Sequence, residues 1–202
     1  ATSAEATVDI SAATACGVVH VLAMGDSLTA GGFGSEPYPK QLEAMLNSDT
    51  ELEPGTQYKV HNAGICGETT EEMVERLPSE LDELSQQGIR PAFILILGGT
   101  NDMGSCSPEE IVRNLLKLRE LAVAAQARPV MLTIPRTEDG LSPVARLVNR
   151  RLRAEAAQDR AFTVVDISGV PEERLADGVH FDSEGYGAFA RAVFAAVARR
   201  QR

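Results

Sequence analysis

Short apolar runs alternate with longer amphipathic stretches along this chain. The runs that predict strands are VVHVLA at 18–23, YKVHNA at 58–63, FILIL at 93–97, VMLTI at 130–134 and FTVVDI at 162–167. Three of them are almost continuously apolar, as expected of parallel strands that are covered on both faces. The alternation of strands with helical stretches predicts an α/β fold, in which a parallel sheet carries helices on both sides.

Polar residues mark where the intervening helices begin. Four signals predict helix starts, at Thr69, Ser107, Ser142 and Ser183. The first two are each followed three residues later by Glu, which makes a capping box, and the second and third are followed by Pro. After Ser107 the apolar residues recur at helical spacing, at Ile111, Leu115, Leu118 and Ala122. These helices are therefore expected to pack one face on the sheet.

Length and composition are those of a globular protein. The 202 residues suit a single domain, which we expect over 17–202, preceded by a loosely ordered arm at 1–16. No apolar run approaches the ~18 residues that span a bilayer, and no intact signal peptide is visible. Three cysteines, Cys16, Cys66 and Cys106, form no disulfide framework or metal-binding spacing and favour a reducing, cytoplasmic setting.

The net charge of −10, from 29 acidic and 19 basic residues, argues against one class of partner. An acidic surface repels phosphate backbones, so nucleic acid is not expected to bind. A neutral or cationic small molecule is admitted more easily than a polyanion.

Chemically active residues follow the predicted strands. GDSLTAGG occupies 25–32, NAGICGETT 62–70, GGTND 98–102 and DGVH 177–180. Because the carboxyl ends of parallel strands meet at one edge of the sheet, these four loops should gather there. They would bring together a hydroxyl, glycines, an amide, a carboxylate and an imidazole.

Of the three histidines, His180 is the candidate general base. His20 and His61 lie inside predicted strands, whereas His180 lies in a loop three residues after Asp177. At this spacing the carboxylate can hold one ring nitrogen and leave the other for a hydroxyl. Serine needs such a base to become a nucleophile, which makes Ser27 the candidate nucleophile.

Three groups could stabilise the oxyanion of a tetrahedral intermediate. They are the backbone N–H of Ser27, the backbone N–H of Gly64 and the side-chain amide of Asn101. Gly64 would also allow a close approach of the backbone.

Taken in order, the four blocks resemble those of the GDSL, or SGNH, hydrolases, over about residues 18 to 197. The name SGNH would refer here to Ser27, Gly64, Asn101 and His180. The resemblance implies a flavodoxin-like, three-layer α/β/α fold with a five-stranded parallel sheet. It also implies hydrolysis of esters or thioesters of a small-molecule substrate, without a metal or cofactor.

The same resemblance implies roles for three further residues. Asp177 would complete a triad, Asp26 would support the nucleophile loop, and Asp102 would be structural. The stretch NAGICGETTEEMVERLP is similar to the arylesterase and lysophospholipase/thioesterase branch, which points to small or monoacyl esters. Cys66 and Cys106 depart from the family pattern; free thiols are expected, and a disulfide between them is the less favoured alternative.

Other functions stay open at this point. The same site could transfer the acyl group to an alcohol, or the chain could be a silent module that binds a ligand. Asp177, His180 and Asp182 could instead hold a metal, although one His with two carboxylates is a thin ligand set.

Overall fold

The computed structural model describes residues 17–32, 34–52, 55–159 and 162–198, so the predicted arm at 1–16 lies outside the described residues. Within these ranges five parallel strands form one sheet in the order β2-β1-β3-β4-β5. The strands are β1 Val18–Gly25, β2 Gln57–Gly64, β3 Phe93–Leu97, β4 Arg128–Leu132 and β5 Thr163–Val165. The predicted fold class and five-stranded sheet are confirmed.

All five predicted strands occur, but the fourth lies earlier than its apolar pattern suggested. We expected 130–134, and the strand ends at Leu132. Beyond it the Thr133 hydroxyl accepts Ile167 N–H, and Ile134 N–H donates to the buried Asn149 side chain. Thr133 N–H still donates to the Val165 carbonyl of β5 at 3.0 Å, but at Ile134 a side chain replaces the neighbouring strand as the partner, which ends the regular pairing.

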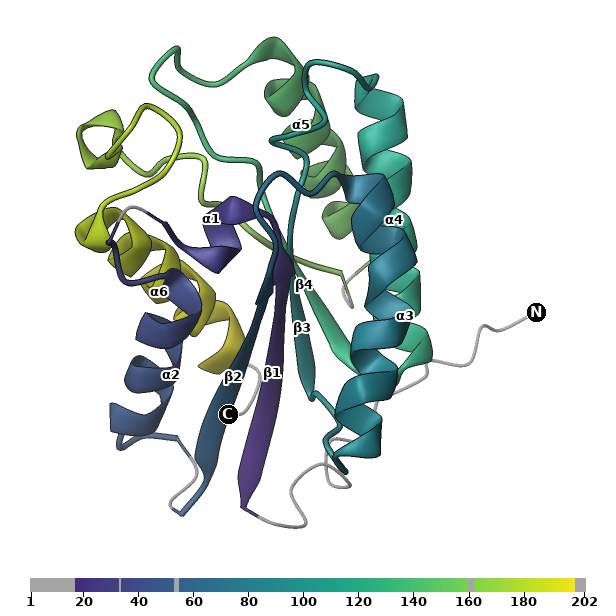
Figure 1. Ribbon diagram of the computed structural model, residues 1–202, viewed down its shortest axis with the longest axis vertical. Helices are drawn as coiled ribbons and strands as arrows, with labels where there is room; N and C mark the ends of the chain where they lie inside the picture. The colour runs from purple at the N-terminus through teal and green to yellow at the C-terminus, as the bar shows by residue number, and fades with distance from the viewer. Residues whose placement is uncertain (1–16, 33, 53–54, 160–161, 199–202) are drawn as a thin grey trace.

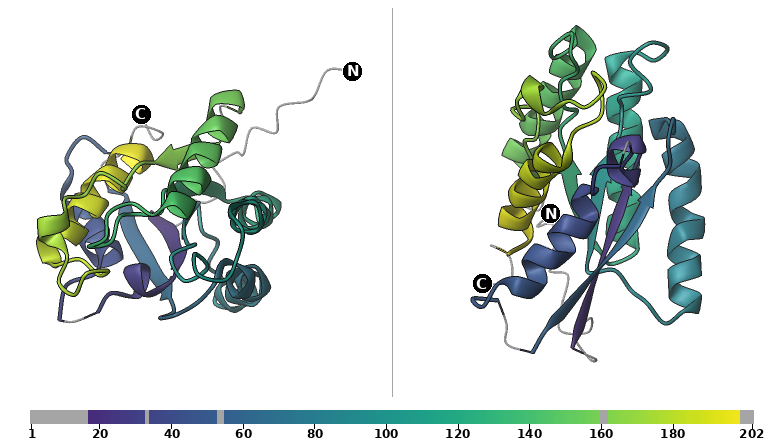
Figure 2. Two further views of the ribbon diagram at one scale, coloured as in Figure 1. Left: turned by 90° about the horizontal axis from the view of Figure 1, so that it is seen from above. Right: turned by 60° about the vertical axis from the view of Figure 1, so that its left-hand side comes forward.

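Helices cover the sheet on two faces, as Figures 1 and 2 show. One face carries α2 Tyr38–Ser48 and α6 Ser183–Ala198, and the other carries α3 Thr70–Gln86, α4 Pro108–Ala124 and α5 Pro143–Gln158. Strand β1, between β2 and β3, contacts both helix layers, because Val19 and Val21 join the core under α2 and α6 while Leu22 and Met24 join the other core. Burial on both faces explains the continuous apolar runs.

The four predicted helix starts agree with the structure. Both capping boxes form, and Ser142 accepts the N–H of Ala145 through its hydroxyl. The last helix begins at Ser183, but its cap is Asp182, whose carboxylate accepts the Gly185 N–H at 2.7 Å. The described part of the chain contains no helix long and apolar enough to cross a membrane.

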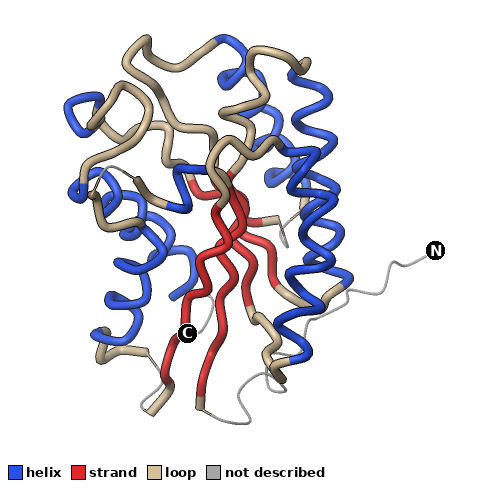
Figure 3. Tube along the Cα trace, viewed as in Figure 1, coloured by secondary structure: helices blue, strands red, loops and turns tan. Residues whose placement is uncertain are grey.

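Loops gather at the carboxyl edge of the sheet, the upper end in Figure 3. A single helical turn, α1 Ser27–Ala30, follows β1 directly at this edge. The loops that follow β2 and β3, and the loop before α6, end at the same edge. The fold thus brings the four blocks of the sequence together.

Candidate active site

The turn that presents Ser27 is organised by Asp26. Its carboxylate Oδ1 accepts the Leu28 N–H at 2.9 Å, and its carbonyl accepts the N–H groups of Thr29 and Ala30 at 3.0 Å. Asp26 is fully buried and caps α1. A capping carboxylate satisfies backbone donors that the first helical turn leaves without partners. Ser27 therefore sits at the first helical position, on a turn that Asp26 holds.

The electrostatic setting of Asp26 is unusual for a carboxylate. Burial raises the pKa of Asp26 to about 7, and the nearby Asp102 and Glu68 carboxylates add to this, while the Leu28 hydrogen bond opposes it. Its second oxygen, Oδ2, has no hydrogen-bond partner among the described residues. Desolvation and like charges both favour the neutral acid at this position.

His180 is held by a small closed loop before α6. Leu175 and Phe181 form an antiparallel bridge, and Ala176 N–H donates to the His180 carbonyl at 2.7 Å. Phe181 is fully buried and packs against the ring of Phe189, with 4.9 Å between ring centroids. His180 thus directly precedes a residue that is fixed in the core, Phe181.

Ser27, His180 and Asp177 form a continuous chain of hydrogen bonds. The distance from Ser27 Oγ to His180 Nε2 is 2.8 Å, and that from His180 Nδ1 to Asp177 Oδ2 is 2.9 Å. Because a carboxylate only accepts, Nδ1 carries the proton and Nε2 accepts from the serine hydroxyl. This arrangement can remove a proton from Ser27 and stabilise the resulting imidazolium.

The Asp177 carboxylate is fixed from its other side. Its Oδ1 accepts the N–H groups of His180 at 2.7 Å and Val179 at 3.1 Å. Burial acts to raise the pKa of Asp177, but the hydrogen bonds from His180 and Val179 outweigh it and lower that pKa. The loop at 135–142 supports this segment, since Glu138 N–H donates to the Gly178 carbonyl at 2.7 Å.

Two of the expected oxyanion donors are oriented and open. Asn101 donates one N–H of its amide to the Glu68 carbonyl at 2.8 Å, which leaves the second N–H on an exposed side chain. The N–H of Ser27 has no acceptor within the described ranges. Both groups can donate to an oxygen that arrives at the site.

The two glycines of the second block differ. Gly64 N–H donates to Asn62 Oδ1 at 3.0 Å, and a Cβ on Gly64 would lie 2.1 Å from the Ala30 nitrogen. Gly67 has a φ of +81°, open space where a Cβ would lie, and an N–H without an acceptor among the described residues. From the sequence, the oxyanion role was assigned to Gly64, whose N–H is occupied, and no such role was assigned to Gly67. The signal for Gly67 was its place in the same block, within a turn.

Asp102 lies beneath the site. It is fully buried, and its carboxylate accepts the Thr70 hydroxyl at 2.5 Å and the Thr70 N–H at 3.1 Å. These bonds tie the end of the third block to the start of α3. Asp182, which the sequence suggested as a possible metal ligand, instead caps α6, and its Oδ2 lies 3.6 Å from Arg174 Nη1.

The remaining candidates lie apart from the hydrogen-bonded chain. Cys66 is exposed, Cys106 is half-buried, and both are free thiols, as expected. His20 and His61 bind each other across β1 and β2, with 2.9 Å between Nδ1 and Nε2. Burial lowers the pKa of both imidazoles, and their proximity lowers that of His61 further.

Comparisons with known proteins agree with this fold and show the family. The model of the GDSL-like lipase/acylhydrolase family matches residues 23–188. Esterase TesA of Pseudomonas aeruginosa is 29% identical over 167 residues, which are 79% of this chain and 78% of that protein. An arylesterase of Vibrio mimicus is 36% identical over 115 residues, 56% of this chain and 54% of its own length.

A solved structure shares the fold. The lipase/acylhydrolase of Enterococcus faecalis superimposes with a TM-score of 0.73 at 22% identity, covering 90% of this chain and 96% of its own. The family match includes the blocks that contain Ser27, Asn101 and His180. This chain belongs to the GDSL-like lipase/acylhydrolase family.

Proposed function

We propose that this protein is a serine esterase that hydrolyses carboxylic esters, thioesters included, through an acyl-enzyme on Ser27. The observation that carries the proposal is the unbroken hydrogen-bond chain from Ser27 Oγ through His180 to Asp177. The family membership and the relatives named esterase and arylesterase support the same reaction class.

In the first half-reaction Ser27 Oγ attacks the acyl carbon while its proton passes to His180 Nε2. The electron pair of the carbonyl π bond moves to its oxygen and forms the oxyanion. When this intermediate collapses, the bond to the leaving oxygen or sulfur breaks, and His180 returns the proton to that atom. Asp177 stabilises the transient imidazolium throughout.

In the second half-reaction water replaces the alcohol. His180 Nε2 takes a proton from the water as its oxygen attacks the acyl carbon. The bond to Ser27 Oγ then breaks, and Oγ recovers the proton from His180. The carboxylic acid leaves, and the enzyme returns to its starting state.

For the oxyanion we propose donors from three loops. Ser27 N–H and the second N–H of Asn101 are two of them. For the third, the free N–H of Gly67 is better suited than that of Gly64, which already donates to Asn62. An N–H that must first break a hydrogen bond within the protein stabilises the transition state less.

We further propose that the acyl group is apolar and small or monoacyl. Ile65 is an exposed large apolar side chain, at 46% exposure, and its N–H donates to the Gly25 carbonyl at 2.9 Å. It therefore lies beside the nucleophile turn, where an acyl chain could cover it. A panel of p-nitrophenyl esters of increasing chain length tests this, with highest kcat/KM expected beyond acetate.

The direct test of the reaction is p-nitrophenyl acetate hydrolysis by wild type and by Ser27→Ala. Removal of the nucleophile should lower kcat by about 10⁴-fold or more. Near wild-type activity in Ser27→Ala would refute the proposal. Adding a competing alcohol and analysing the products distinguishes hydrolysis from acyl transfer.

A further inference from the structure

One arginine on α3 contacts both ends of the loop that holds the two glycines, here called the 63–68 loop. Arg76 Nη2 donates to the Ala63 carbonyl at 2.9 Å. Its Nε and Nη2 also donate to the two carboxylate oxygens of Glu68, each at 2.6 Å. A planar guanidinium that makes paired bonds with a carboxylate fixes geometry as well as charge.

The bonds of Arg76 bear on both candidate glycine donors. The Ala63 carbonyl belongs to the same peptide group as the Gly64 N–H, so fixing one fixes the other. At the far end, Glu68 N–H donates to the Ile65 carbonyl at 3.3 Å and closes the turn that contains Gly67. Whichever glycine donates to the oxyanion, its N–H lies in the segment between the Ala63 carbonyl and Glu68, and Arg76 is hydrogen-bonded to both.

Glu68 extends the same control to the third loop. Its carbonyl accepts one amide N–H of Asn101 at 2.8 Å. Because the two N–H groups of an amide are rigidly related, this bond sets the direction of the second, open N–H. The position of Glu68 thus decides where Asn101 points.

Charge and burial make this arrangement sensitive to Arg76. The Glu68 side chain is 5% exposed and that of Arg76 is 16% exposed. Hydrogen bonding to Glu68 raises the pKa of the Arg76 guanidinium. Without the arginine, a buried carboxylate would have no counter-charge, which is strongly unfavourable, and Glu68 would turn towards water.

We infer that Arg76 is a positioning residue for the oxyanion donors, acting through the 63–68 loop and the Glu68 carbonyl. This inference rests on the proposed function. Arg76 touches no reacting atom; its bonds align the N–H groups that do. Glu80, one helical turn away, accepts the N–H of Arg76 Nη1 at 2.9 Å and so adds a further contact that fixes the guanidinium.

The test compares Arg76→Gln and Arg76→Lys with a matched control, Arg119→Gln. Arg119 is also a partly buried helical arginine, 23% exposed, and it pairs with Asp159 after α5, away from the Ser27 edge. Lysine at 76 keeps the charge but lacks the planar guanidinium that makes the paired bonds to both Glu68 carboxylate oxygens. It also serves as the second variant if Arg76→Gln folds poorly. Each rate is expressed per active site, titrated with a fluorophosphonate.

The expected result is a loss in kcat with little change in binding. Arg76→Gln should lower kcat per site for p-nitrophenyl acetate by about 10- to 100-fold and change KM by less than about threefold. The Ki of a trifluoromethyl ketone, whose adduct carries an oxyanion, should rise by the same factor as kcat/KM falls. Arg76→Lys should lie between Arg76→Gln and wild type, and Arg119→Gln should keep its kcat.

Two outcomes would overturn the inference. One is a per-site kcat in Arg76→Gln equal to that of wild type or of Arg119→Gln. Any fall in total activity would then come from a smaller folded fraction and not from misaligned donors. The other is unchanged amide hydrogen exchange in the 63–68 loop of Arg76→Gln. The exchange measurement needs no activity, so it tests Arg76 even if wild type hydrolyses no ester, an outcome that would refute the proposed function instead.

Discussion

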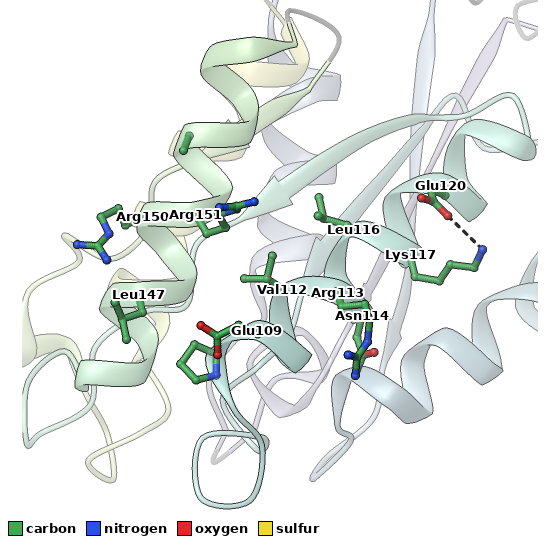
Figure 4. Close-up of a pocket in the computed structure, with 12 residues that line it drawn as sticks. Glu109, Val112, Arg113, Asn114, Leu116, Lys117, Glu120, Leu147, Arg150 and Arg151 are labelled. Atoms are coloured by element: carbon green, nitrogen blue, oxygen red, sulfur yellow. Dashed lines mark hydrogen bonds and ion pairs between the residues drawn. The ribbon is translucent and has the colours of Figure 1, made fainter.

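Two regions of this molecule differ in what they could offer a ligand: one provides volume and apolar surface, the other a set of hydrogen-bonded polar groups. Between α4 and α5 lies a groove of about 970 Å³, shown in Figure 4, where Val112, Leu116 and Leu147 supply apolar surface. The Ser27 edge is instead defined by hydrogen bonds: serine to histidine, histidine to aspartate, and asparagine to a loop carbonyl.

The difference lies in reactive chemistry. The groove's polar lining is mostly charged, with Arg113 and Arg150 among its cations, and no serine, histidine or cysteine belongs to its lining. Arginine and glutamate on an exposed helix face are common and are solvated. A nucleophile, a base and open donors close together are rare, so these features, and not the volume of a groove, select the Ser27 edge as the candidate reaction site.

The largest effect among the site's donors should come from Asn101→Ala. Removing one oxyanion donor typically lowers kcat by about 10²- to 10³-fold. KM should change by less than about threefold, because the bond forms in the transition state. Steady-state kinetics with p-nitrophenyl acetate measure this. A rise in KM with kcat unchanged would remove Asn101 from the oxyanion site.

Substitutions of the two glycines should separate activity from stability. Gly67→Ala has room for its methyl group but a φ of +81°, a strain of about 1–2 kcal/mol that should shift the loop and lower kcat about tenfold. Gly64→Ala places a Cβ 2.1 Å from the Ala30 nitrogen and should mainly lower Tm. Kinetics and thermal unfolding of both variants test this. A Gly67→Ala enzyme with wild-type kcat would contradict the proposed role of Gly67.

Asp26→Asn should change how stability depends on pH. Burial raises the pKa of Asp26 to about 7, so folding favours its protonated form. Wild type therefore loses stability from this group as the pH rises from about 4, the unfolded value, through about 7. Asparagine keeps the cap and never ionises, so the variant should lack this loss. Urea unfolding at pH 5 and pH 8 measures it, and parallel pH profiles for both proteins would contradict it.

The smallest effect should come from the groove. Leu147→Glu adds a charge to an apolar, 42% exposed position of α5 and should leave kcat and KM within about twofold of wild type. The same p-nitrophenyl acetate assay provides the measurement. A tenfold loss of kcat in this variant would show that the groove takes part in the reaction and would break the contrast between the two regions.

Most of the fold was predictable because local patterns and burial agree. The apolar strand runs match the sheet, and both capping boxes form as their spacing predicts. The end of β4 was predicted wrongly because Thr133 and Ile134 continue the strand-like pattern, while the Thr133 hydroxyl accepts the Ile167 N–H and the Asn149 side chain accepts the Ile134 N–H. Such partners, distant in sequence, leave no mark in periodicity.

The site was predictable as far as its residues carry distinctive chemistry. Ser27, Asp177 and His180 do, and the structure brings them within hydrogen-bond distance. The pairing of Glu68 with Arg76 could not be predicted, since a Glu shortly before a helix and an Arg within that helix are an ordinary combination of surface residues. The positioning role inferred for this pair depends on its burial and on the bond from Arg76 to the Ala63 carbonyl, and both arise only in the folded chain.

The most direct test of the account is covalent labelling of wild-type protein with a fluorophosphonate, followed by peptide mass spectrometry. We predict one equivalent of label, located on Ser27 and prevented by His180→Ala. Label on another residue, such as Cys66, or ester hydrolysis by a protein whose Ser27 stays unlabelled, would contradict the account.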